Sequence, residues 1–227
     1  MSERRWVRKW RRDAATGGFS PLPTRVVSNE EYLPLPETPE QARVAARLGE
    51  TVAVNARRLG MRRRDFLGTS SGMAAAFLAL NSVFGRFFAV DPVEALEPAA
   101  ADARKPAGQF IFDVQTHHGA TPRQQAFGPD HVLWGTDSIW WGSLQWQIEA
   151  LRRFTMPESL IKRFGYRPLT ADVKAGILGS NAARLYGIDP SAPRHPVPPD
   201  YISKLRAAYL EEGPRPSLTQ YGWVLEG

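Results

Sequence analysis

Apolar residues recur at helical spacing in a segment that begins with Thr38-Pro39-Glu40-Gln41. Thr38 suits the N-cap and Pro39 the first helical position, and Gln41 completes a capping box, in which side chains and backbone groups bond reciprocally at a helix start. The apolar positions that follow are Val44, Leu48, Val52 and Leu59. This pattern predicts one helix of about 20 residues.

A second apolar segment, residues 73–85, follows the sequence Arg62-Arg63-Arg64-Asp65-Phe66-Leu67 after a short polar stretch. With 13 residues it is too short to span a bilayer, which takes about 20 apolar residues. An arginine pair, one further residue, Phe-Leu and a short, weakly hydrophobic segment resemble a twin-arginine (Tat) export signal, with Arg63 and Arg64 as the pair. The alternative is a soluble amphipathic helix whose basic end contains arginine pairs.

Small residues at Val93-Glu94-Ala95 have the spacing that precedes a signal-peptidase site, so we expect cleavage after Ala95. The resemblance implies that the Tat machinery exports the protein to the periplasm or another extracytoplasmic space. A leader that is not cleaved would leave the chain attached to the membrane.

Two short apolar runs predict buried strands, because polar residues follow each of them. The first is Phe110–Phe112, and the second begins at His131 and ends at Asp137. The carboxyl ends of barrel strands point toward the active-site face of an α/β barrel, so side chains from two such strands can meet there.

Side chains along the first of these strands point alternately to its two faces, which divides the polar residues into two groups. Asp113, Gln115 and His117 share one face of an extended strand, whereas His118 points to the other face. Gln115 and His117 could therefore point together into a barrel mouth.

Helical patterns fill most of the rest of the chain. We expect Gly179 to end one of these helices and Asn181 to cap the next, which stops at Gly187. The expected helices are residues 143–154, 157–164, 170–179, 181–186 and about 199–212.

Positive charge is concentrated at the start of the chain. Residues 1–64 hold 14 Lys and Arg against 7 Asp and Glu, and the remaining residues hold 15 against 16. A globular nucleic-acid-binding domain should keep its basic residues on the folded part, so we expect no nucleic-acid partner. Residues 1–13, with six Lys and Arg and two Trp, are expected to form a solvated tail, and the leader to contact the membrane transiently.

The absence of cysteine excludes a disulfide scaffold, a thiolate zinc site and a cysteine nucleophile. A metal would need His, Asp or Glu as ligands. The chain has only four histidines, at positions 117, 118, 131 and 195. His131 is expected to face solvent.

Two C-terminal runs resemble a known family. The run from Val132 to Asp137, VLWGTD, and the run from Ile177 to Ile188, ILGSNAARLYGI, resemble the C-terminal end of the amidohydrolase superfamily, in its amidohydrolase-related branch. The segment that contains His117 resembles the family's first barrel strand, whose His-x-His pair binds metal. The resemblance covers residues 109–118 and 128–190.

This resemblance implies an α/β fold: an incomplete amidohydrolase-type (β/α) barrel with its first strand, last strand and C-terminal helices, preceded by a helical or disordered leader. It implies a metal-dependent hydrolase with a small-molecule substrate. Asp137 would bind the metal, expected to be zinc, and act as general base, with His117 as a ligand and Gln115 as a weak third. Asp113 and His118 would support these ligands.

Two departures weaken that expectation. Gln115 stands where the family has the earlier histidine of its pair, and an amide is a poorer transition-metal ligand than imidazole. Only nine residues, Ala120–Gly128, separate the expected first and last strands, and a complete barrel takes about 250 residues against 132 after Ala95. We therefore expect either a natural internal deletion or a gene model that has lost a central segment, with weak zinc binding and weak or absent hydrolysis in the chain as given.

The sequence thus predicts four parts: a basic, Pro-rich extension with one helix (1–60), a Tat-type segment (61–95), a linker (96–108) and a partial amidohydrolase-like domain (109–227). Two alternatives to an exported hydrolase stay open. One is a non-catalytic remnant or interaction module, and the other is a membrane-surface protein retained by its leader.

Overall fold

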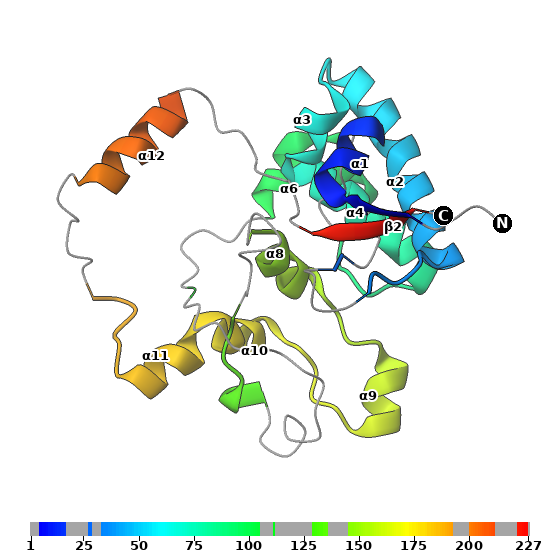
Figure 1. Cartoon of the computed structure of the whole chain (residues 1–227). Coiled ribbons are helices and arrows are strands. Elements are labelled where there is room, and N and C mark those ends of the chain that lie inside the picture. The colour runs from blue at the N-terminus through cyan, green and yellow to red at the C-terminus, as the bar shows by residue number, and fades with distance from the viewer. Residues whose placement is uncertain are drawn as a thin grey trace.

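The computed structural model describes part of the chain. Figure 1 shows the arrangement of its elements. The described residues are 5–16, 27–28, 33–104, 111, 129–135, 145–192, 200–211 and 222–226.

The two ends of the chain pair with each other. Strand β1 (Arg5–Arg8) runs antiparallel to β2 (Trp223–Glu226), and helix α1 (Lys9–Thr16) follows β1 (Figure 1). Val7, Val27 and Val224 form a small core beside this pair. The prediction that residues 1–13 form a solvated tail is therefore wrong for residues 5–13. Its partner strand lies at the far end of the sequence, and no local pattern reveals such a pairing.

Five helices between residues 39 and 103 form one packed unit, the α2–α6 unit, and the first of them is the helix that the sequence predicted. Thr38 Oγ1 accepts from Gln41 N (3.2 Å) and Gln41 Oε1 accepts from Thr38 N (2.7 Å), which confirms the capping box. The helices are α2 (Pro39–Arg58), α3 (Arg63–Leu67), α4 (Ser70–Phe84), α5 (Pro92–Leu96) and α6 (Pro98–Ala103).

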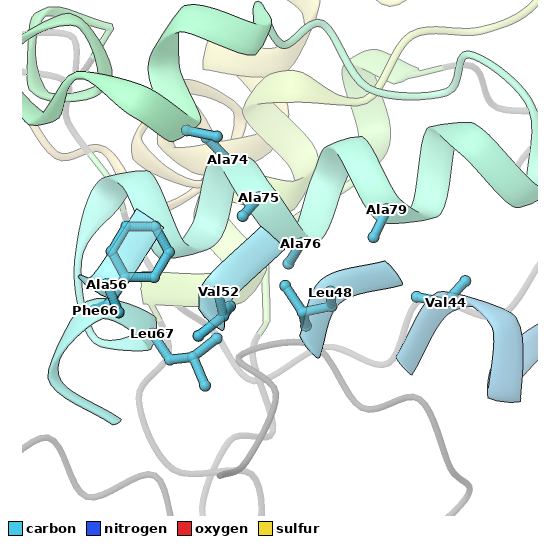
Figure 2. Packing of buried hydrophobic residues seen from close by; sticks show 11 residues of the cluster. Val44, Leu48, Val52, Ala56, Phe66, Leu67, Ala74, Ala75, Ala76 and Ala79 are labelled. Atoms are coloured by element: carbon cyan, nitrogen blue, oxygen red, sulfur yellow. The ribbon is translucent and has the colours of Figure 1, made fainter. Parts of the chain in front are cut away.

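The core of this unit lies between α2 and α4. Figure 2 shows side chains of α2 along the face of α4 that carries small residues. Alanines on α4 let the larger side chains of α2 approach closely, and burying that apolar surface stabilises the pair. The facing residues are Val44, Leu48 and Val52 on α2 and Ala75, Ala76 and Ala79 on α4.

Residues expected to form the start of a linker belong to the same unit. Helix α6 packs against α4 and α5, and its Ala101 is completely buried. Asp91 caps α5 in a second capping box with Glu94. The Ala/Pro composition that suggested a linker thus also suits short helices with proline in the first turn.

The described residues between 129 and 211 form mainly helices, together with a 3-10 turn and a π turn. Thr170 caps α10, and helical conformation continues through Gly179 into α11, so the expected break at Gly179 is wrong. Gly187 ends α11 in a left-handed conformation, as predicted. The elements are η1 (Pro129–His131), α8 (Gln145–Arg153), α9 (Glu158–Phe164), α10 (Ala171–Ala175), η3 (Gly176–Ser180), α11 (Asn181–Tyr186) and α12 (Tyr201–Glu211).

The expected strand that begins at His131 is not formed within residues 131–135. His131 lies in η1, and residues 132–135 form neither helix nor strand. A parallel strand needs a hydrogen-bonded neighbour, and the described part of the chain offers none here. No barrel is present among the described elements, which form a helix-rich structure with one two-stranded sheet. None of the described helices has the length and apolarity needed to cross a membrane.

Candidate functional site

The turn that leads toward Asp137 is held by the helix at its back. Asn181 Nδ2 donates to Pro129 O and to Val132 O, each over 2.9 Å, and Asn181 is 5% exposed. Asn181 has helical backbone angles and is not an N-cap, so its predicted capping role is wrong. Its side chain is free to fix the 129–132 turn instead.

A π turn immediately precedes Asn181 in the sequence. The backbone N–H of Asn181 donates to Gly176 O, five residues back, and a Cβ at position 176 would lie 3.1 Å from Asn181 Oδ1. Glycine at 176 therefore leaves room for the amide. Such π turns are frequent at functional positions of helices.

Two arginines complete the support of the same turn. Arg184 Nη2 donates to Asp130 O over 2.7 Å, and Arg167 Nη1 pairs with the Asp130 carboxylate over 2.9 Å. Since Asn181 and Arg184 lie one turn apart on α11, one helix face holds residues 129–132 at three carbonyl oxygens.

A shared core lies beneath this turn. Trp134, Ile148, Ile177 and Leu178 are buried together, and Ile111 packs against them. Ile111 is the described residue of the expected first strand and Trp134 belongs to the expected last one. The two segments that continue to His117 and Asp137 therefore start from one core.

The predicted chemistry-bearing residues lie beyond the described positions. This applies to Asp113, Gln115, His117, His118 and Asp137. Their proposed approach to one metal ion stays a prediction. Where the chain is described, no three His, Asp or Glu side chains gather closely enough to hold a metal. His131 is exposed, as predicted.

The arginine pair of the Tat-type segment lies at the surface. Arg63 and Arg64 are exposed on α3, and Arg62 pairs with Asp65 at 2.6 and 2.9 Å. Hydrogen bonding from Arg62 lowers the pKa of Asp65 below its ordinary value.

A buried ion pair and a half-buried lysine near α8 were not predicted from the sequence. Arg153 Nη1 donates to Glu94 Oε2 over 2.5 Å, and Lys174 Nζ donates to Arg152 O over 2.7 Å. Burial lowers the pKa of Lys174. The only sequence signal was the position of Glu94, three residues after Asp91, which also suits a capping box.

Comparison with protein families finds a match to part of the chain. Residues 124–188 match the amidohydrolase family. The matched range contains both C-terminal runs that carry the resemblance, the 129–132 turn, Asn181 and Arg184, and it does not reach the segment that contains His117. No curated protein and no solved structure matches the chain. The match supports a hydrolase-family resemblance for this amidohydrolase-like segment.

Amidohydrolases generally use a divalent metal, and the donor set of this chain fits such a metal poorly. A catalytic zinc usually takes three protein ligands plus water. The sequence offers one imidazole, one carboxylate and one amide from His117, Asp137 and Gln115, and the described residues add no further cluster. These three side chains alone do not make a catalytic zinc site of the usual kind.

Proposed function

We propose that the protein is a shortened, metal-dependent hydrolase of the amidohydrolase type, directed to the periplasm by a Tat-type leader and acting weakly or not at all on a small molecule. The observation that carries this proposal is the family match over residues 124–188. Within it, Asn181 and Arg184 hold the turn from which the chain continues to Asp137.

Because the set of metal ligands is incomplete, we expect the hydrolytic activity to be low. Loss of one imidazole weakens zinc binding, and a poorly held metal does not lower the pKa of its water properly. The alternative of a non-catalytic remnant predicts binding and turnover that are both absent.

Zinc titration calorimetry and hydrolysis of activated esters and amides by the purified full chain test this proposal. We expect weak zinc binding that His117→Ala and Asp137→Asn each reduce further. His131→Ala is the matched control, because His131 is exposed and lies outside the proposed ligand set. Equal binding by all four proteins would overturn the ligand assignment, and tight stoichiometric zinc with fast turnover would overturn the shortened-enzyme proposal.

Exposed aromatic residues support a second function, contact with an anionic membrane surface. Trp6 and Trp10 are 42% and 53% exposed and lie among basic residues, and such a combination binds lipid headgroups. Pelleting with vesicles that contain phosphatidylserine should decrease after Trp6→Ala combined with Trp10→Ala. Unchanged pelleting would exclude this surface.

A further inference from the structure

The apolar part of the Tat-type segment is buried in the α2–α6 unit. Ala74, Ala75 and Phe77 on α4 are 0% exposed, as is Phe66 on α3. The arginines at positions 62–64 stay exposed. A receptor could thus reach the guanidinium pair in this structure, but the hydrophobic stretch that an export signal must present is covered.

Helix α2 supplies much of that cover, although it precedes the Tat-type segment in sequence. Leu48 and Val52 are 4% and 2% exposed against the alanines of α4 (Figure 2). Asn55 Nδ2 also donates to Ala95 O over 2.8 Å, which ties the end of α2 to α5.

The expected cleavage position is closed as well. Ala95 lies inside α5 and is 2% exposed. The neighbouring Glu94 accepts from Asp91 N (2.9 Å) and pairs with Arg104 (3.4 Å) and Arg153 (2.5 Å). Proteases cut exposed, flexible backbone, so a peptidase cannot act here while these contacts persist.

We propose that α2 is an autoinhibitory cover, which holds the Tat-type segment in a closed state and lets export proceed only when α2 leaves α4. This inference rests on the export signal in the proposed function. The exposed arginine pair identifies the segment in both states, and opening of the α2–α4 contact uncovers the face of α4 that packs against α2.

A matched pair of substitutions on α2 tests the cover without altering residues 61–95. Val52 is 2% exposed and Val54 is 64% exposed on the same helix. Val52→Ala removes buried apolar contacts and should raise the open fraction about tenfold, whereas Val54→Ala should leave it unchanged.

The readout is the exported fraction of the full chain carrying a C-terminal reporter, compared with a chain that begins at Met61 and lacks α2. We expect cytoplasmic retention of the full chain, strong export of the Met61 chain, and increased export for Val52→Ala alone. Arg63→Lys with Arg64→Lys should abolish export of the Met61 chain. Hydrogen exchange of the α4 amides in purified Val52→Ala reports directly on opening.

Each other outcome is decisive. Equal export of the full chain and the Met61 chain would overturn the cover while leaving the signal intact. Absence of export from both chains would overturn the signal, and the cover with it. Equal behaviour of Val52→Ala and Val54→Ala, in export and in exchange, would show that the α2–α4 contact does not control access.

Discussion

Glu94 and Arg153, which are 59 residues apart in sequence, form a buried ion pair with a distance of 2.5 Å. Glu94 belongs to α5 and Arg153 ends α8. The pair therefore joins the α2–α6 unit, called the leader unit below, to the amidohydrolase-like segment. Backbone bonds lie beside it: Ala89 N donates to Arg153 O (2.7 Å) and Thr155 N to Phe87 O (2.6 Å). The leader unit is thus bonded to the family-matched segment by side chains and by backbone.

The first prediction concerns this pair. Glu94→Ala removes the closer of the two carboxylates that pair with buried Arg153 and leaves Glu149 at 3.5 Å. We expect it to lower the free energy of unfolding by about 3–5 kcal/mol, because a poorly compensated buried charge is costly. Glu97→Ala is the control: Glu97 pairs with Arg58 at the surface, and its loss should cost less than about 1 kcal/mol. Urea denaturation measures both, and similar losses would show that the buried pair does not join the two parts.

The second prediction compares two glycines in the leader unit. A Cβ at Gly72 would lie 2.3 Å from Phe66 O and 2.7 Å from Leu67 Cα, so Gly72→Ala must displace backbone and should lower the melting temperature. Gly49 on α2 has no atom within 4 Å of such a Cβ, and Gly49→Ala should raise stability by up to about 1 kcal/mol through helix propensity. Thermal unfolding followed by circular dichroism should show shifts of opposite sign; a tolerated Gly72→Ala would mean that α3 and α4 are not in close contact.

Local sequence signals predicted the helix ends at Thr38 and Gly187 correctly, whereas those at Gly179 and Asn181 were wrong. Thr38 and Gln41 bond within one helical turn, and Gly187 adopts a left-handed conformation at its own position, so neighbouring residues decide both features. Periodicity likewise identified the buried face of α2, because a helix presents every third or fourth residue to one side.

Features that depend on distant residues could not be predicted in this way. The pairing of β1 with β2 joins opposite ends of the chain, and the role of Asn181 depends on carbonyl groups about 50 residues earlier. The segment that resembles an export signal is also a good core helix, because small apolar residues suit both. Composition alone therefore did not reveal that α2 covers it.

The third prediction concerns Asp65 in the twin-arginine motif. Hydrogen bonding by Arg62 lowers the pKa of Asp65, so Arg62→Ala should raise that pKa toward its ordinary value. The depressed folded-state pKa means that this contact stabilises α3 at neutral pH and that the stabilisation is lost as pH falls through the folded-state pKa. NMR titration of the Asp65 carboxyl carbon measures the shift. Arg63→Ala removes the guanidinium next to Arg62 in sequence and should leave the pKa of Asp65 unchanged. If Arg63→Ala shifted that pKa as much as Arg62→Ala, the cause would be the positive charge of the segment and not the hydrogen bond from Arg62.

The last prediction concerns Asn181, whose amide holds the turn within the family-matched segment. Asn181→Ala removes the amide donor from Pro129 O and from Val132 O, and we expect a loss of about 1–3 kcal/mol in the free energy of unfolding. Asn181→Asp keeps the size but points a carboxylate oxygen at two carbonyl oxygens, so it should cost at least as much.

Ser180→Ala provides the matched control for these two variants, because Ser180 is the exposed neighbour of Asn181 and should tolerate the change. Urea denaturation measures the global effect, and hydrogen exchange at Val132 N, which donates to Pro129 O, measures the turn itself. If the amide holds the turn, exchange at Val132 accelerates in both Asn181 variants and not in Ser180→Ala. Unchanged exchange at Val132 would mean that Pro129 and Val132 keep their geometry without Asn181, and that α11 does not position the chain leading to Asp137.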